Sequence, residues 1–549
     1  MHRPSVRRLA LGAVAALGLA APATASAGAA PGPVPGTRPI LVVGNNHAGT
    51  ADVVDPVTFS RLFRMNIVPD LPERLAEIHR DPVRLAFFYL IRSQIGMGHD
   101  QLVDDLFPSP DGRVLYVSRP SLADVVAFDL RTHEILWRRP VAGNRSDHMA
   151  ISPDGARLLV SASTGGVVHA IDTATGEIVA DIPSGDQPHE SNYSEDGSKI
   201  FHASIGTVFT PLDDPIFDAA KGDRVFQIVD AKTYEVIRRI DIGKKLADAG
   251  YPGMSSAVRP MAVAPGERYV YLQISFLHGF VEYDLIEDRV TRVVDLPLTE
   301  ASRRLRRDEY VLDSAHHGLA INPEGTKLCA AGTMSDYAAI VRRSDFTARV
   351  IPVGEKPYWS TNSADGRHCY VSVSGADRVA VLSYDEEREI ASIPVGDHPQ
   401  RIRVGRLKID EPAPGEPATV PGAPAASVPA APGSAAVRAR PGRLTLRAVT
   451  RRDRRAPFRL RVSGRMASTT TATCVGTVRV EARRGTVRVG RANLRLRRRG
   501  NACVYAGTVK VGRTALRGGR TARLTLQARF GGNALLLPGR SGVARARLG

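Results

Sequence analysis

Short apolar runs separated by polar turn residues cover the chain from about residue 38 to residue 408. Within the runs, Val, Leu, Ile and Tyr tend to occupy alternate positions, and Asp, Gly, Ser or Thr residues follow, as after Arg113–Val117 and Val125–Leu130. An alternation of period two, bounded by such residues, is typical of antiparallel β-hairpins. The pattern therefore predicts an all-β protein with many short strands.

One turn sequence recurs along this region and sets the spacing of the strands. Its copies are Ser109-Pro110-Asp111-Gly112, Ser152-Pro153-Asp154-Gly155, Ser194-Glu195-Asp196-Gly197, Ala264-Pro265-Gly266-Glu267, Asn322-Pro323-Glu324-Gly325 and Ser363-Ala364-Asp365-Gly366. Successive copies are 43, 42, 70, 58 and 41 residues apart. Three steps equal a unit of about 42 residues, and the other two equal that unit with an insertion. This period, with four short strands per unit, predicts the blades of a β-propeller.

A second recurring phrase gives the number of blades. It ends the strands at Val125–Asp129 and Val167–Asp172 and occurs seven times, because Ala51–Asp55 also fits it. We expect residues 39–68 to supply three strands of one blade and residues 400–408 to supply the fourth. Such a closure pairs both ends of the repeat region and removes exposed strand edges. The predicted fold is a seven-bladed β-propeller over residues 38–408.

The same phrases carry a resemblance to a known family. Ile393–Pro399 (IPVGDHP) and Ser152–Gly155 (SPDG) resemble the repeats of YVTN-repeat β-propellers, the YncE-like secreted proteins. The resemblance covers roughly residues 39–408 and implies the propeller fold. Relatives with this repeat include ligand-binding proteins, lactonases, lyases and the propeller subunits of redox enzymes. The resemblance therefore implies a fold and leaves the activity open.

Residues outside the repeat region divide into three segments. Residues 1–27 combine Arg3, Arg7 and Arg8 with an apolar run and end in Ala25-Ser26-Ala27, which predicts a signal peptide. Residues 409–442 are dominated by Pro, Ala and Gly and predict an extended linker. No later stretch has about 18 uninterrupted apolar residues, so no membrane span is expected. We expect an extracellular or cell-envelope protein.

Residues 443–549 have short alternating strands and an unusual charge. From residue 440 onward there are 28 basic residues against Asp453 and Glu481, a net charge of +26, so residues 1–439 carry 18 − 26 = −8. Residues 529–541 are similar to the closing strands of bacterial immunoglobulin-like repeats, which implies a β-sandwich. Cys474 and Cys503 lie within it, and we expect them to form a disulfide because the chain is exported.

The basic charge of this sandwich permits two interpretations. Arginines at alternate positions place many guanidinium groups on one solvent face, which would suit an anionic cell-envelope polymer. Alternatively, they are only a solvated surface. Few aromatic residues interleave the arginines, so specific nucleic-acid binding is not expected.

Two further cysteines lie in the repeat region. Cys329 and Cys369 follow Gly325 and Gly366 by four and three residues, respectively. This difference of one residue points the side chains to opposite faces of equivalent strands. We interpret both as buried free thiols, with a disulfide between them as the alternative.

Candidate functional residues gather on one face of the predicted propeller. Every sizeable insertion falls in loops of this face: residues 71–98, 207–223, 244–258 and 298–314, the first with an amphipathic helix. The polar residues just before the innermost strands lie on the same face. A site with convergent imidazole, carboxylate, guanidinium and aromatic groups is a reasonable ligand site. The candidate residues are Asp104, Asp147, His148, His189, Glu190, Arg259, His316, His317, Tyr358 and His398.

Three interpretations of these residues stay open. They pack the inner strands around a water-filled channel, or they bind a small polar or anionic ligand, or they form a metal or acid–base site. For the third, His148, His189 and His317 would ligate a transition metal such as copper, zinc or iron. The leading hypothesis is a ligand-binding protein tethered by its basic sandwich. The alternative is a hydrolase, lyase or metal-dependent oxidoreductase that uses the same histidines.

Several other chemistries are excluded by motif. The sequence has no Cys-x-x-Cys-His haem attachment, no Gly-x-Ser-x-Gly nucleophile elbow and no phosphate-binding Gly-x-x-x-x-Gly-Lys loop.

Overall fold

The computed structural model describes ten stretches of the chain, which belong to two compact units, one within residues 1–417 and the other within residues 418–549. The predicted signal peptide and residues 410–442 of the predicted linker lie outside these stretches. Among the described helices, none is long and apolar enough to cross a membrane. The described stretches are 35–208, 220–310, 314–409, 444–449, 458–467, 477–485, 487–499, 502–516, 521–530 and 539–548.

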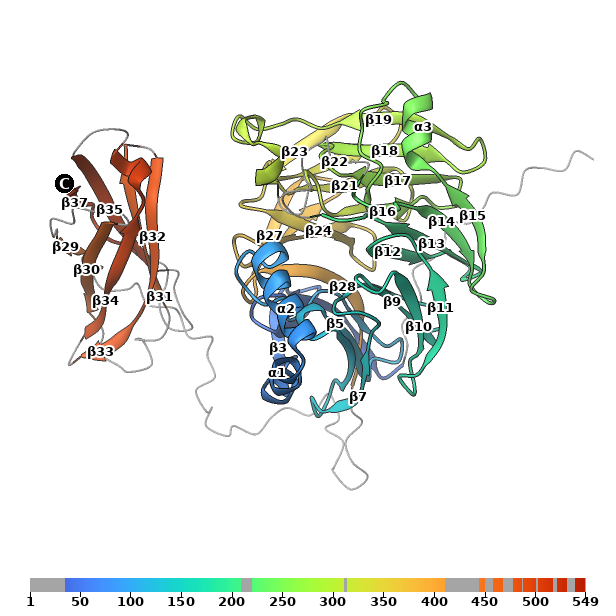
Figure 1. Cartoon of the computed structure of the whole chain (residues 1–549), viewed down its shortest axis with the longest axis horizontal. Coiled ribbons are helices and arrows are strands. Elements are labelled where there is room, and N and C mark those ends of the chain that lie inside the picture. The colour runs from blue at the N-terminus through green and yellow to red at the C-terminus, as the bar shows by residue number, and fades with distance from the viewer. Residues whose placement is uncertain are drawn as a thin grey trace, which may run out of the picture. The chain divides into compact units, whose positions relative to one another are not determined.

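The first unit contains seven four-stranded antiparallel sheets in its described residues, shown in chain order by colour in Figure 1. One sheet combines both ends of the region, since β28 pairs with β1. The predicted β-propeller fold and the predicted split sheet are therefore present. The first sheet consists of β28 (Pro399–Lys408), β1 (Thr37–Asn45), β2 (Thr50–Val54) and β3 (Arg61–Asn66), the second of β4 (Leu106–Pro108), β5 (Val114–Arg119), β6 (Asp124–Asp129) and β7 (Ile135–Pro140), and the third of β8 (Ser146–Ile151), β9 (Arg157–Ala162), β10 (Val167–Asp172) and β11 (Ile178–Pro183). The fourth sheet consists of β12 (Pro188–Tyr193), β13 (Lys199–Ser204), β14 (Phe226–Asp230) and β15 (Val236–Ile240), and the fifth of β16 (Val258–Val263), β17 (Tyr269–Ile274), β18 (Gly279–Asp284) and β19 (Arg289–Asp295). The sixth sheet consists of β20 (Leu319–Ile321), β21 (Lys327–Gly332), β22 (Tyr337–Arg342) and β23 (Ala348–Pro352), and the seventh of β24 (Pro357–Asn362), β25 (His368–Val373), β26 (Arg378–Ser383) and β27 (Arg388–Pro394).

The recurring turn sequence has a physical basis in its serine and glycine. In the copy between β4 and β5, Ser109 Oγ donates to Asp111 at 2.6 Å and accepts the backbone N–H of Val114 at 2.9 Å. Gly112 has φ +73°, and a Cβ there would lie 2.6 Å from the backbone nitrogen of Lys408. The turn therefore requires a glycine at this position.

Apolar side chains fill the space between neighbouring sheets. A separate buried cluster lies between each consecutive pair, and one of them joins Leu41 and Val43 of the first sheet to Tyr370 and Val381 of the last. Because each sheet packs on two neighbours, burial of apolar area closes the ring.

The prediction for Cys329 and Cys369 was wrong, because the two residues form a disulfide between β21 and β25 with a Cα–Cα distance of 6.5 Å. Neighbouring sheets stack face to face, so the facing sides of two equivalent strands are opposite faces. A difference of one residue therefore turns the two thiols toward each other. Two consecutive residues of β21 confirm this geometry, since Leu328 packs on the preceding sheet and Cys329 packs on the following one.

The predicted insertion after β3 forms two helices, α1 (Leu71–Arg80) and α2 (Pro82–Leu90), followed by a π-turn at Ile91–Ile95. Ile78 and Phe88 pack on Leu122 of the connection between β5 and β6. The helices therefore lie against the second sheet, as Figure 1 shows in blue. Four shorter helical segments interrupt other loops in the described residues of this unit: α3 (Ile242–Asp248) and the 3-10 turns Pro120–Leu122, Ser302–Arg304 and Arg307–Glu309.

The second unit is a two-layer β-sandwich in its described residues. Cys503 lies in its core and is disulfide-bonded, whereas Cys474 lies outside the described residues, so the predicted pairing stays a prediction. The layers are β29 (Arg447–Val449), β30 (Phe458–Ala467), β34 (Ala502–Val511) and β33 (Arg497–Arg499) against β32 (Val487–Arg495), β31 (Thr477–Arg484), β35 (Ala522–Phe530), β36 (Gly539–Arg540) and β37 (Ala544–Leu548).

Candidate functional site

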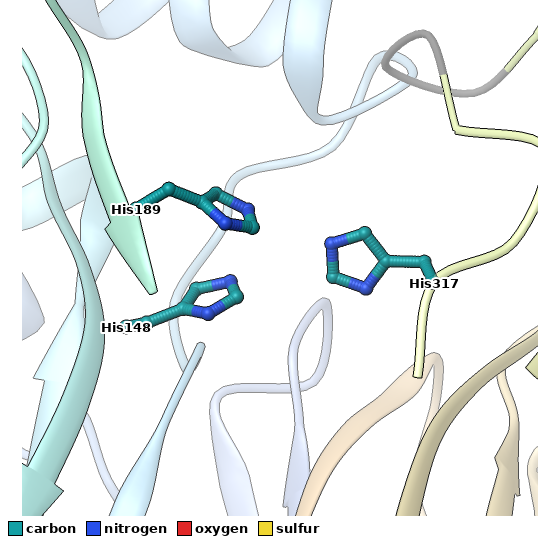
Figure 2. Close-up of side chains that lie close together, drawn as sticks. All are labelled: His148, His189 and His317. Carbon is teal, nitrogen blue, oxygen red and sulfur yellow. The ribbon is translucent and has the colours of Figure 1, made fainter. Parts of the chain in front are cut away.

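Three histidines from three different sheets meet near the propeller axis. His148 lies in β8, His189 lies in β12, and His317 precedes β20. One ring nitrogen from each lies within 4.8 Å of the others, and all three side chains are buried. In Figure 2, the imidazole of His317 points across the gap toward the other two. We call these three residues the histidine cluster.

The ring position of these residues repeats from sheet to sheet. The first strand of each sheet, named from the axis outward, has one residue at a position that is equivalent in all seven sheets. This residue pairs with the second strand, as Met149 pairs with Val160 and Ser191 pairs with His202. Of the two residues before this point, the first belongs to the cavity wall or the histidine cluster in every sheet, and the second does so at His148 and Arg401. The first of the two is Asp104, Asp147, His189, Arg259, His317, Tyr358 or Gln400 in successive sheets, and the second is Asp105, His148, Glu190, Pro260, Gly318, Trp359 or Arg401.

A local irregularity in the ladder explains why adjacent residues both reach the axis. In five of the seven sheets the pairing register shifts at this point, as between Ser146 and Met149 or between Pro188 and Glu190. In a regular strand, neighbouring side chains point to opposite faces. A β-bulge breaks this alternation and redirects side chains. At His148 and Arg401, whose sheets both have such a shift, the second position therefore lines the cavity beside the first.

A carboxylate orients the first histidine of the cluster. Nδ1 of His148 is hydrogen-bonded to Oε2 of Glu190, and Nε2 lies against a guanidinium nitrogen of Arg401. Since a guanidinium can only donate, Nε2 carries the lone pair and Nδ1 carries the proton. Burial raises the pKa of Glu190 to about 8, partly opposed by the charges of Arg403 and Arg401. The lone pair of His148 is thus directed into the cavity.

The cluster histidines are neutral at pH 7. Burial, with the positive charges of nearby arginines and the other histidines, holds the pKa of each ring well below its usual range. Nδ1 of His189 and Nδ1 of His317 have no hydrogen-bond partner among the described residues. Neutral imidazole is the form that ligates metals. Buried polar atoms without partners are rare and indicate water, an ion or a ligand.

Two arginines at the site were missed by the sequence analysis. Arg401 is fully buried, its guanidinium stacks 4.2 Å from the Trp359 ring centroid, and Oδ1 of Asp104 lies 3.8 Å from Nη2. Arg145 forms an ion pair with Asp147, and its Nη2 donates to Gln101 Oε1 at 3.2 Å. The repeat register could have revealed Arg401, because Arg401 occupies the position of His148 and Glu190.

The carboxylates at the site are buried beside these cations. Oδ2 of Asp104 has no partner among the described residues, although it lies 4.0 Å from Nε2 of His148. Burial raises the pKa of Asp104 to about 7, against the attraction of Arg401. Asp104, Asp147 and His148 also present one oxygen or nitrogen each within 4.8 Å of one another. The cavity thus offers oxygen ligands beside the three imidazoles.

The cavity enclosed by these groups is small. The space in which the centre of a water molecule can lie is about 20 Å³, so the cavity can hold a few water molecules or an ion with one small ligand. Ile95 and Gln101, at the end of the helical insertion, form part of its wall, so the insertion covers the site. The wall residues are Ile95, Gln101, Asp104, Arg145, Asp147, His148, Gln187, His189, Ile205, Val208, Arg259, Tyr358, Gln400 and Arg401.

Most of the predicted site residues come together, and two do not. Asp104, Asp147, His148, His189, Arg259 and Tyr358 line the cavity, with His317 stacked on Tyr358 at 4.2 Å and Glu190 behind His148. His316 instead lies 3.3 Å from the Tyr337 hydroxyl and packs on His278. His398 stacks on His47 at 3.9 Å, and His47 stacks on His99 at 4.4 Å.

Comparison with known proteins adds a likeness in structure alone. No protein-family model matches the chain, and no curated protein matches it. Among solved structures, hydrazine synthase of Kuenenia stuttgartiensis is similar over 56% of this chain and 96% of that chain, with 16% sequence identity and a TM-score of 0.44.

Proposed function

We propose that this protein binds a transition-metal ion near the propeller axis through His148, His189 and His317. The observation that carries the proposal is the convergence of three buried, neutral imidazoles, contributed by three sheets, with ring nitrogens within 4.8 Å of one another. Imidazole is a common ligand of zinc, copper and iron.

The size and donor chemistry of the site suit such an ion. Tetrahedral zinc with Zn–N bonds of about 2.0–2.1 Å places ligand nitrogens roughly 3.4 Å apart. Small rotations of the three rings would reach this distance from the present separation. The small cavity also favours an ion over a large organic ligand. Three protein ligands leave a fourth position for an exogenous group.

Glu190 supplies the support that metal-ligating histidines usually have. Its carboxyl oxygen Oε2 accepts a hydrogen bond from Nδ1–H of His148, which fixes the tautomer and makes Nε2 a better ligand. Glu190 is thus a positioning residue in this proposal.

The wider function we propose is that of an exported binding protein, which presents this site on the face that carries the insertions. Support for export is the signal-peptide pattern of residues 1–27. A hydrolase, lyase or oxidoreductase built on the same metal is the alternative.

Elemental analysis tests the metal site. The full-length protein is incubated separately with Zn²⁺, Cu²⁺ and, without oxygen, Fe²⁺, and is then freed of unbound metal. We expect one ion per chain for at least one metal, and its loss in His189→Ala and in His317→Ala. The matched control is His316→Ala, because His316 is a buried neighbour that faces away from the cluster. No stoichiometric metal, or equal retention in all variants, would contradict the proposal.

We further propose that the second unit binds an anionic cell-envelope polymer. One outer face of the sandwich carries nine exposed arginines, and Glu481 is the one acidic residue among the described residues of that face. Like charges lie directly opposite each other at Arg479 and Arg529 and at Arg523 and Arg547. A polyanion would relieve this repulsion. The nine are Arg479, Arg483, Arg488, Arg491, Arg495, Arg523, Arg529, Arg545 and Arg547.

Retention of the full-length protein on purified envelope material tests this second proposal. Retention should weaken steeply as salt is raised, since each neutralised charge releases counterions. A variant with Arg479, Arg523 and Arg529 changed to Ser should show a shallower salt dependence. The control changes Arg138, Arg157 and Arg378 of the first unit to Ser, which removes the same charge. Equal retention of both variants would refute tethering by this face.

A further inference from the structure

We infer that Arg401, together with Arg145, forms a binding site for a small oxyanion, such as a short carboxylate, which would occupy the open position of the metal. This inference rests on the proposed metal site and names the class of ligand that the site takes.

Arg401 lacks hydrogen-bond partners for part of its guanidinium group among the described residues. Its side chain is fully buried, yet Nε and Nη1 have no hydrogen-bond partner among the described residues. The guanidinium donates toward Nε2 of His148, and its nearest carboxylate oxygen, on Asp104, is 3.8 Å away. A buried guanidinium without close acceptors is costly. The arrangement therefore calls for an acceptor that the wall of the cavity does not supply.

Metal binding would increase this need. Nε2 of His148 is the nitrogen that a metal would use, because Nδ1 is taken by Glu190. Once the metal holds Nε2, Arg401 loses its hydrogen-bond acceptor there. The guanidinium would then lie next to a cation, and among the described carboxylates only Asp104 lies within about 4 Å of it.

The balance of charge at the wall points to an anion. Arg145 is paired with Asp147, whereas the described carboxylate nearest to Arg401 is Asp104, at 3.8 Å. A divalent cation adds further positive charge to a site with little access to water. Buried charge is stable only when it is paired. An anion between the metal and Arg401 would compensate both charges.

The shape of the site restricts this anion to a small one with two or more oxygens. Cζ of Arg401 lies over the Trp359 ring, 4.2 Å from its centroid, and the side chain is fully buried, so the guanidinium has little freedom to turn. A planar guanidinium pairs with two oxygens of one carboxylate or oxyanion. Arg145 is anchored by Asp147 and Gln101, and its Nε has no partner among the described residues. The small cavity excludes bulky acids.

Titration with formate tests the inference on the full-length protein. Cobalt(II) is used as the metal, because its visible absorption reports a change of ligand at the open position. Formate is added at constant ionic strength, with chloride as the comparison anion. We expect formate to change the spectrum with saturation and chloride to act much more weakly.

Variants of two arginines in the same strand separate the anion site from the metal site. Arg401→Gln should keep one cobalt ion per chain and weaken formate binding at least tenfold. The matched control is Arg403→Gln, since Arg403 pairs with Asp105 and does not line the cavity. Formate affinity that is equal in Arg401→Gln and in the unmodified protein would overturn the inference, as would an equal response to chloride.

Failure of the metal proposal gives a different result. If the unmodified protein binds no metal, formate is titrated into the metal-free protein and its thermal stabilisation is measured. Stabilisation that is lost in Arg401→Gln would then support an anion site without a metal. Stabilisation absent from the unmodified protein would refute the anion site itself.

Discussion

The interior of the propeller and the outer face of the sandwich both gather charged residues, but they do so under opposite conditions. Near the propeller axis, positively charged arginines and acidic side chains are buried together, and most of them lie close to a partner of opposite charge. On the sandwich, nine arginines are exposed and Glu481 is the one described acid among them. Buried charges depend on the identity and position of each partner. Exposed charges of one sign act through their number and are screened by salt.

The contrast predicts a large effect where a buried ion pair is broken. Arg119 is fully buried, and its Nη2 lies 2.8 Å from Asp124, while its Nη1 lies 2.5 Å from Asp70 at the start of α1. Arg119→Met should lower the free energy of unfolding of the propeller by about 1.5–3 kcal/mol, because Asp124 loses charged hydrogen bonds without reaching water and keeps only Arg138 as an ion-pair partner among the described residues. Urea denaturation measures this value.

The control for this prediction is Arg491→Met on the exposed face of the sandwich, which should change stability by less than about 0.5 kcal/mol. A loss below about 1 kcal/mol for Arg119→Met would remove the distinction between the two regions.

Acid should destabilise the propeller through its buried histidines. His202 is enclosed by the hydroxyls of Ser184 and Ser191, at 2.7 and 2.9 Å, and burial lowers its pKa from 6.5 to about 4. Between these pH values the unfolded chain binds a proton that the folded chain does not. The free energy of unfolding therefore falls as pH falls from 6.5 to 4, by roughly 3 kcal/mol for this residue.

His202→Gln, which cannot titrate, provides the comparison. The difference in stability between the unmodified protein and this variant should be constant above about pH 7 and should shrink as pH falls through the window. A difference that does not depend on pH would contradict the assignment of this histidine.

The smallest effect expected has the opposite sign. Arg523 lies directly opposite Arg547 on the sandwich face. Arg523→Thr should stabilise the second unit by a few tenths of a kcal/mol (about 0.3), because it removes a repulsion between like charges on neighbouring strands. The shift in Tm should be measurable at low salt and vanish near 0.5 M salt. Destabilisation at low salt would show that the arginine contributes packing instead.

The repeat made the fold accessible from sequence, because each unit folds alike. The turn at Ser109–Gly112 and the phrase at Val125–Asp129 specify hairpins by local chemistry, and their period of about 42 residues specifies the propeller. Stacking between units was harder to predict. The disulfide of Cys329 and Cys369 was mispredicted, since the faces of single strands were compared without regard to how neighbouring sheets face each other.

Site residues could be predicted where they occupy a repeated position in the first strand of a sheet. Site residues outside these positions could not be predicted. His189 and Tyr358 follow a proline that begins the first strand, so the sequence indicates their place. Arg401 also follows such a proline, Pro399, so the repeat register indicates its place, although its strand pairs with one that lies more than 350 residues away. Arg145 precedes the first residue of β8 and lies outside the two repeated positions. Its ion pair with Asp147 and its hydrogen bond to Gln101 depend on the tertiary structure, which local patterns do not specify.

X-ray absorption by the metal tests the central claim most directly. For the zinc-loaded protein, the account predicts about three imidazole nitrogens at about 2.0–2.1 Å, fewer in His189→Ala or His317→Ala, and no change in His316→Ala. A shell of oxygen ligands alone, or a spectrum that His189→Ala and His317→Ala leave unchanged, would contradict the assignment of the histidine cluster as a metal site.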